Sequence, residues 1–290
     1  MTKYLFPLTT LFSLGLLAFP ALAGRADVSV PVPAPAVVPV PTPAVVPTPA
    51  VVLAPADFAL LQKALVPMGA GGGLKLSSAV ALTGNTSGIS VVMHTRLEVV
   101  AQRPGQFRIT AARVNDQGIA QQKFILVSNG AKVWTYAPGT NRYSVMSLAA
   151  FNVGDDVFLM KGLLASFYLD AGKDIASLAQ GLNSGDRAAT LLDMKKRGVA
   201  FTRQPPSADS PEEVVYRMAM SKDGYNVYFY TNSRTGQLTR FDLTGTSDGT
   251  QIAMREDVTQ ISSLSSVPKG TFYFMPPSGA VRAAKVSVRP

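Results

Sequence analysis

The chain has 290 residues, of which 47% are hydrophobic, and 27 Lys and Arg against 18 Asp and Glu give it a formal net charge of +9. It contains no cysteine and one histidine, which excludes a disulfide framework, a cysteine metal site and a histidine cluster. The excess of basic residues favours anionic partners. For a chain outside the cell membrane, these would be lipid or wall polymers rather than nucleic acid.

The N-terminus has the pattern of a secretory signal. Lys3 precedes the apolar run Leu5–Phe19, and Ala21-Leu22-Ala23 forms a small-residue cleavage site before Gly24. The alternative is an uncleaved membrane anchor, but this run is shorter than the ~20 apolar residues that a span needs. We therefore expect cleavage after Ala23 and a periplasmic location. Without a cysteine at the cleavage site, the mature protein would carry no lipid anchor.

Residues 24–56 are rich in proline, and Pro-Ala-Val-Val recurs from Pro35, Pro43 and Pro49. Frequent proline fixes φ and removes backbone donors, which favours a polyproline II conformation over helix or strand. We interpret this segment as a disordered linker; an arm that spans the cell wall or docks a partner is the alternative. The folded domain would then occupy residues 57–290.

The domain is predicted to open with a short helix. Asp57 could cap a helix that carries Phe58, Leu61 and Leu65 on one face, and Pro67 would end it. The following segment, Leu74–Leu82, fits a helix or a strand.

A first set of strands follows. Ile89–Gln102 alternates between apolar and polar residues in its second half, as a strand with one wet face does, and Phe107–Val114 continues that pattern. Lys123–Ser128 and Lys132–Tyr136 flank Asn129-Gly130, which predicts a hairpin with a two-residue type I′ turn. At least three antiparallel strands therefore meet here. Which alternating face would point inward is left open by the sequence.

The period then changes to that of a helix. An apolar stripe recurs at helical spacing on Val157, Met160, Leu164 and Phe167. Asp174–Leu182 and Asp186–Lys196 are predicted to be shorter helices. We expect this block to cover one side of the strands.

Strands return after this block, separated by turn signals at roughly ten-residue intervals. They are predicted at Val214–Ala219, Tyr225–Thr231, Leu238–Thr244, Ile252–Val258 and Thr271–Met275. Strands, a helical insertion and a second set of strands together indicate an α+β fold.

Catalytic patterns are weak. His94 lies on the polar side of its predicted strand, with no nucleophile motif nearby. Ser266 and Lys269 match a Ser-Lys acylase spacing, but Pro268 separates them and the companion motifs are missing. We expect no enzymatic activity, no cofactor and no metal site; an envelope hydrolase that uses the Ser266 and Lys269 pair is the remaining alternative.

Four motifs together resemble the periplasmic carrier of outer-membrane lipoproteins (LolA-type), a superfamily that includes uncharacterised periplasmic relatives. They are Arg103-Pro104-x-x-Phe107, Ile125–Gly130, Val133–Tyr136 followed by Pro138, and Phe272–Gly279 with its Pro-Pro-Ser-Gly turn. The resemblance implies an incomplete antiparallel β-barrel, or half-barrel, whose concave side is covered by helices.

The resemblance also implies a function and a set of residues. The protein would bind the acyl chains of a lipoprotein or another lipid and carry them, with transient contact to an anionic membrane surface. The alternative is a lipid-sensing module that binds a membrane-bound partner protein. The expected cavity residues are Phe107, Ile109, Phe124, Leu126, Trp134, Met160, Leu164 and Phe167.

Arg103 stands at the position that the family uses to latch its lid. A guanidinium has five donors and can bind the free carbonyls at a helix end. The alternative is an ordinary surface arginine at the end of a strand, and the sequence leaves both interpretations open.

Overall fold

The structure is a computed structural model that describes residues 53–69, 72–86, 89–154, 157–170, 181, 187–196, 199–206, 210–220, 225–247 and 250–286. The predicted signal and most of the predicted linker lie outside these residues, as does all but one residue of the predicted helix Asp174–Leu182. No helix in the described ranges is long and apolar enough to cross a membrane.

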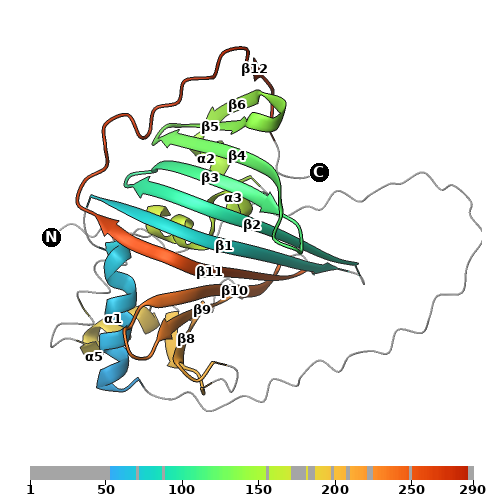
Figure 1. The fold of residues 1–290 in the computed structure, drawn as a ribbon. Coiled ribbons are helices and arrows are strands. Elements are labelled where there is room, and N and C mark those ends of the chain that lie inside the picture. The colour runs from blue at the N-terminus through green and yellow to red at the C-terminus, as the bar shows by residue number, and fades with distance from the viewer. Residues whose placement is uncertain are drawn as a thin grey trace, which may run out of the picture.

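The architecture is one open, twisted sheet of twelve strands with helices on one side (Figure 1). The strand order is β12-β6-β5-β4-β3-β2-β1-β11-β10-β9-β8-β7, so the two edges differ and the sheet does not close on itself. All neighbours are antiparallel except β12 and β6. This arrangement confirms the predicted α+β half-barrel.

The first half of the sheet follows chain order. Its strands are β1 (Gly73–Thr86), β2 (Ile89–Gln102), β3 (Gln106–Val114), β4 (Ala120–Asn129), β5 (Lys132–Ala137) and β6 (Arg142–Ser147). The ambiguous segment Leu74–Leu82 is therefore a strand. A short 3-10 helix, η2 (Pro138–Thr140), joins β5 to β6.

The β4–β5 hairpin is confirmed, but its turn is shifted by one residue from the predicted type I′ turn. Ser128 pairs with Val133, which leaves Gly130 and Ala131 as the two loop residues. Gly130 has a φ of +92°, whereas Asn129 is not among the residues with positive φ. The Asn129 side chain instead accepts hydrogen bonds from the backbone N–H groups of Ala131 and Lys132. This local bonding fixes Asn129 at the last position of the strand.

The second half of the sheet joins the first through a long pairing of β11 with β1. Its strands are β7 (Val199–Arg203), β8 (Glu213–Met220), β9 (Tyr225–Asn232), β10 (Leu238–Ser247) and β11 (Thr250–Leu264). The four strands predicted between Val214 and Val258 are confirmed, and β7 is additional.

The prediction of a last strand at Thr271–Met275 is wrong. Thr271 and Tyr273 donate their backbone N–H groups to Pro268 and Gly270 in local turns, rather than to a neighbouring strand. The chain instead crosses the sheet and adds the short strand β12 (Val281–Arg282) to the edge at β6 (Figure 1). The side chain of Phe274 fixes the crossing segment, because its ring packs against three aromatic rings of β5 and β6.

Helix α1 (Pro55–Gly69) begins two residues before Asp57 and runs two residues past Pro67, so both predicted ends are wrong. Asp57 lies in the first turn, where its carboxylate accepts a hydrogen bond from the N–H of Ala54 at 2.7 Å. The predicted apolar face is confirmed. Phe58, Leu61 and Leu65 are buried.

The predicted single stripe from Val157 to Phe167 is divided between two helices. Helices α2 (Leu148–Asn152) and α3 (Val157–Lys161) precede Gly162, and residues 163–170 form the next helix. Gly162 has a φ of +78°, a conformation that ends a right-handed helix. The last described helix, α5 (Arg187–Lys196), agrees with the prediction for Asp186–Lys196.

The helices define an inner face of the sheet, the side that they cover, and an outer face. Figure 1 is viewed onto the outer face, with α2 and α3 behind the sheet. Side chains of the inner face and of the helices form one buried apolar cluster. We call residues 148–154 and 157–170 the helical cover.

Asp57 fixes α1 to the far end of the inner face. Its buried carboxylate lies 3.1 Å from Nη1 of Arg203 on β7 and accepts a hydrogen bond from the hydroxyl of Tyr216 on β8 at 3.0 Å. Burial, and next the Asp57 carboxylate, raise the pKa of Tyr216.

Asp57→Ala should lower the free energy of unfolding by about 3 kcal/mol, because it leaves the buried Tyr216 hydroxyl and the 38% exposed Arg203 guanidinium without their acceptor. Tyr216→Phe is the matched control; it removes one hydrogen bond and should cost about 1 kcal/mol. Urea unfolding of both variants checks the prediction. Equal losses would contradict the assignment of Asp57 as the anchor.

Candidate functional site

The candidate site is the apolar interface between the inner face and the helical cover. On β3, Phe107, Ile109 and Ala111 alternate with more exposed residues and have no accessible surface. The register places Ile109 opposite Leu126 and Ala111 opposite Phe124 on β4. Four of the five strand residues predicted for the cavity, Phe107, Ile109, Phe124 and Leu126, are therefore contiguous on the inner face.

The helical cover supplies the other side of this interface. Met160, Leu164 and Phe167 are all buried, as they must be to contact the sheet. The Phe167 ring lies 6.1 Å from that of Phe229 on β9 and 5.7 Å from that of Phe241 on β10. The structure thus brings seven of the eight predicted cavity residues to one interface.

Trp134 lies on the opposite side of the sheet. It pairs with Val127 and Val145, whereas Val133 and Thr135 of the same strand take the inner positions. Its ring stacks on Phe274 of the crossing segment at 6.3 Å between centroids. The structure does not bring Trp134 together with the other seven residues.

Arg103 contacts the helical cover. It lies in the turn between β2 and β3, and its Cζ is 5.0 Å from the ring centroid of the buried Tyr168. The expected latch contact was with backbone carbonyls at a helix end; among the described residues, the observed contact of Arg103 is with this aromatic ring instead. A guanidinium over a tyrosine face is attracted by the ring quadrupole.

Glu256 makes a contact with the cover that the sequence interpretation missed. Its side chain is fully buried on the inner face of β11. It accepts hydrogen bonds from the N–H of Leu164 at 2.8 Å and from the Ser78 hydroxyl at 2.6 Å. The carboxylate thus occupies the N-terminus of the helix 163–170, where the helix dipole favours negative charge.

Burial raises the pKa of Glu256 above its ordinary value of 4.5, and the hydrogen bonds from Ser78, Leu164 and Leu163 oppose that rise. A signal for this residue was present in the sequence. Glu256 continues the alternation of Ile252 and Met254, so a charged residue occupies a core position of a strand.

The absence of a side chain on Gly162 leaves the space that the Glu256 carboxylate occupies. A Cβ on Gly162 would lie 2.8 Å from Oε1 of Glu256 and 2.8 Å from Cδ1 of Leu97. Gly162 also donates its N–H to Phe158 and so ends α3. The glycine therefore allows the chain to turn and the next helix to begin on the carboxylate.

A third polar contact lies within the cover itself. Nζ of the buried Lys161 is 3.4 Å from Oδ2 of Asp170 and 3.3 Å from Oδ1 of Asn152. Burial lowers the pKa of Lys161, and Asp170 opposes this change. The ammonium joins α2, α3 and the helix 163–170 into one body.

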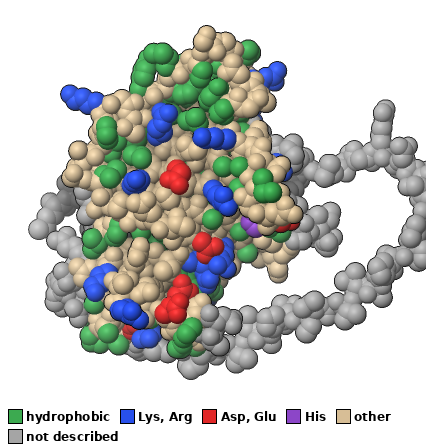
Figure 2. Space-filling view, viewed as in Figure 1, with side chains coloured by type: hydrophobic (Ala, Val, Ile, Leu, Met, Phe, Trp, Pro, Cys, Tyr) green, Lys and Arg blue, Asp and Glu red, His purple; other side chains and the backbone are tan. Residues whose placement is uncertain are grey.

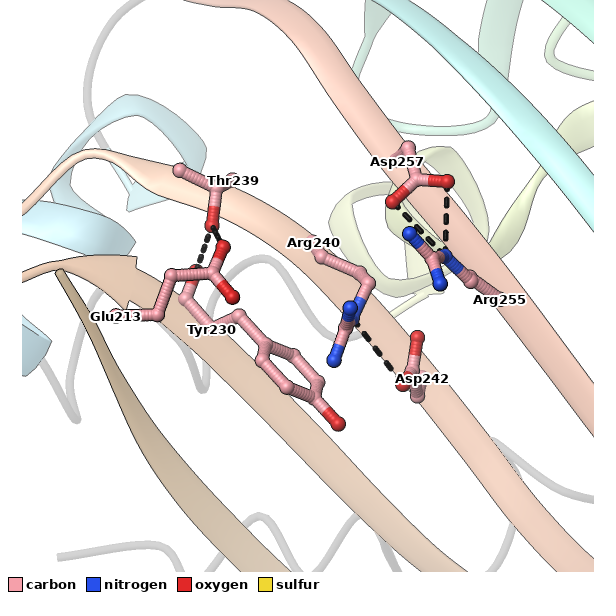
Figure 3. Close-up of polar contacts among 7 residues, drawn as sticks. All are labelled: Glu213, Tyr230, Thr239, Arg240, Asp242, Arg255 and Asp257. Atoms are coloured by element: carbon pink, nitrogen blue, oxygen red, sulfur yellow. Dashed lines mark hydrogen bonds and ion pairs between the residues drawn. The ribbon is translucent and has the colours of Figure 1, made fainter. Parts of the chain in front are cut away.

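The outer face carries a separate charged network over β9, β10 and β11 (Figure 3). The Arg240 guanidinium stacks on Tyr230 at 3.4 Å and its Nε lies 3.3 Å from Asp242 Oδ2. Arg255 binds both oxygens of Asp257. Burial raises the pKa of Asp242, and Arg240 opposes that rise. Acidic and basic side chains are balanced in this network.

Residues suited to catalysis or metal binding do not converge in the described part of the chain. It contains no group of three or more His, Cys, Asp and Glu that could hold a metal ion. His94 is on the outer face, 3.7 Å from Asp116. Ser266 and Lys269 are both exposed in the segment after β11.

No protein-family model and no curated protein matches the sequence. Solved structures of similar fold include LprF from Mycobacterium bovis, at 12% identity and a TM-score of 0.36, matched over 74% of this chain and 97% of that chain. A LolA superfamily protein from Nitrosomonas europaea matches over 74% and 96%, at 9% identity and a TM-score of 0.28.

The MucA/MucB complex of Pseudomonas aeruginosa matches at 13% identity and a TM-score of 0.31, over 77% of this chain and 62% of the matched chain. At these identities and TM-scores the likenesses concern the fold alone. The function of this chain must be inferred from its own residues.

Glu256→Gln should change how stability depends on pH. Because the pKa is raised in the folded protein, the wild type loses stability as pH rises from about 4.5 towards the folded-state pKa. The glutamine variant lacks this loss, so it should gain stability relative to the wild type over the same range. Urea unfolding at a series of pH values measures the difference.

Glu98→Gln is the matched control for that experiment. Glu98 also accepts a hydrogen bond from a serine, Ser77 at 2.7 Å, but it is exposed on the outer face. The same pH dependence in both variants would contradict a special role for the buried carboxylate.

Gly162→Ala should destabilise the protein by about 2–4 kcal/mol, because it adds a Cβ contact to Glu256 and an unfavourable positive φ. Gly139→Ala is the control, since its Cβ would meet nothing within 4 Å. Thermal unfolding of the two variants tests this. A cost for Gly162→Ala as small as that for Gly139→Ala would show that the turn is not constrained.

Proposed function

We propose that this protein is exported to the cell envelope and binds the acyl chains of a lipoprotein or another lipid between its inner face and its helical cover. The observation that carries the proposal is the interface itself. Aliphatic and aromatic side chains line both sides, and two polar contacts from the sheet, Glu256 and Arg103, meet the cover.

Acyl chains suit such an interface because their burial is non-directional. Each CH₂ removed from water contributes about 0.8 kcal/mol. The side chains of the cover now pack against the sheet, so acyl chains would enter by replacing them. Binding would therefore require the cover to move away from the inner face while the sheet keeps its pairing.

The envelope location rests on the sequence. Residues 1–23 have the n-region, apolar run and small-residue cleavage site of a secretory signal. The absence of cysteine leaves no residue for lipid attachment at that site. The mature protein would thus diffuse and exchange cargo, which suits a carrier.

Native mass spectrometry of the full chain, purified from envelope extracts, tests the proposal directly. The expected result is a co-purifying acylated species that a fluorescent fatty acid displaces. A protein that is free of lipid and does not take up the probe would refute acyl binding. A bound lipid without transfer to acceptor vesicles, together with a bound partner protein, would favour the sensor alternative.

Arg103→Leu should loosen the cover. The contact with Tyr168 exists in the closed arrangement, so its loss should favour the open one and tighten probe binding by about two- to thirtyfold. Transfer to an acceptor should slow, because transfer needs the cover to close again. Probe titration and transfer kinetics on the same preparation measure both effects.

Arg96→Leu is the matched control for this prediction. Arg96 is an exposed arginine on the neighbouring strand β2 and points to the outer face. If Arg103→Leu weakens binding and transfer in equal proportion, or behaves as Arg96→Leu does, Arg103 is a structural residue and not a latch.

A further inference from the structure

The crossing segment, residues 271–286, is fixed to the sheet at its β6 edge, and its Phe274 lies on the outer face. The Phe274 ring lies 6.1–6.3 Å from the rings of Trp134, Tyr136 and Tyr143. Further along, Ala283 donates its N–H to the Tyr143 carbonyl at 2.7 Å, and Val286 donates to the Ser144 hydroxyl at 3.2 Å. These contacts attach the segment to β5 and β6 as an integral part of the fold.

This anchoring leaves apolar side chains facing solvent. In an extended chain, neighbours of an inward residue point outward. Tyr273 is 66% exposed and Met275 is 71% exposed. We call Tyr273 and Met275 the apolar ridge.

The charge around the ridge is positive. Between Gln106 and Ser147, which spans β3 to β6, the one acidic residue is Asp116. Asp116 lies in the β3–β4 turn beside His94 of β2. The crossing segment and the loop before it contain no acidic residue. The exposed basic residues of β3–β5, of this loop and of the crossing segment are Arg108, Lys123, Lys132, Lys269, Arg282 and Lys285.

The other half of the outer face differs. Figure 2 shows acidic and basic side chains next to one another over β9–β11, and mostly basic and hydrophobic ones over β3–β6 and the crossing segment. The close-up of the first region shows why its charges cancel, since each arginine lies beside an aspartate (Figure 3). The positive excess is thus local to the ridge.

We propose that the ridge and its basic surroundings form a surface that docks on anionic lipid. Tyr273 and Met275 would enter the headgroup region, where aromatic side chains are favoured, while lysine and arginine contact the phosphates. A stable protein interface buries about 800 Å² on each partner, far more than two side chains provide. A lipid surface needs only a few inserted groups and a distributed positive charge.

This inference rests on the proposed function, because a docked protein would receive or release acyl chains at the membrane. It is tested by flotation of the full chain with vesicles of phosphatidylcholine alone and of phosphatidylcholine with phosphatidylglycerol. The expected result is salt-sensitive binding to the anionic vesicles only. Arg282→Gln with Lys285→Gln should weaken it by about thirtyfold.

The apolar part is tested by Tyr273→Ser with Met275→Ser. The matched control is Val92→Ser with Ile119→Ser, which removes exposed apolar side chains away from the ridge, at 50% and 56% exposure. The first pair should lose vesicle binding and the second should keep it. Equal losses, or no preference of the wild type for anionic vesicles, would overturn the proposal.

Trp134 gives a readout that needs no substitution, because it is the only tryptophan and lies beneath Phe274. Lipids brominated near the headgroup should quench its fluorescence in anionic vesicles; the absence of quenching would overturn docking through this surface. Acyl-probe uptake should persist in the ridge variants. A wild type that binds vesicles but takes up no probe would refute the proposed function and leave the docking surface intact.

Discussion

The hydrogen bonds of the Glu256 carboxylate determine how the cover sits on the sheet. A carboxylate in an apolar interior is costly unless donors surround it, and here the Ser78 hydroxyl and the N-terminus of the helix 163–170 supply them. This directional contact fixes the position of that helix along β11. Phe167 then reaches Phe229 and Phe241, and Gly162 provides the space in which the chain turns.

Apolar and polar contacts thus stabilise the cover in different ways. Apolar packing stabilises any arrangement that removes the inner face from water, including one in which acyl chains replace helical side chains. The contacts of Glu256 and Arg103 are made with the cover in its present position, so under the proposed function they would favour the closed state over an open one. The contacts of Lys161 with Asn152 and Asp170 lie within the cover and would keep its helices together in both states.

Under the two proposals, the two faces of the sheet would serve different partners. The inner face is largely apolar, whereas the outer face has a balanced charged network at β9–β11 and a positive excess at β3–β6. The crossing segment turns the second region into a distinct surface, since Phe274 covers the aromatic rings of β5 and β6 and exposes its neighbours. A membrane-docking surface and an acyl-binding interface on opposite faces could act in turn without competing for residues.

The sequence by itself determined the α+β class, most strands and the apolar residues of β3 and β4, because alternation and helical spacing are local properties. It left open which alternating face would be covered, so Trp134 was grouped with side chains that point the other way. Strand pairing and the position of the cover decide that choice, and both join residues distant in sequence. Tertiary contacts also decide the structure of Thr271–Met275. This segment has the composition of a strand, but its Phe274 ring packs on Trp134 of β5 instead. Glu256 gains its role only from the helix 163–170, whose residue Leu164 lies 92 residues earlier in the chain.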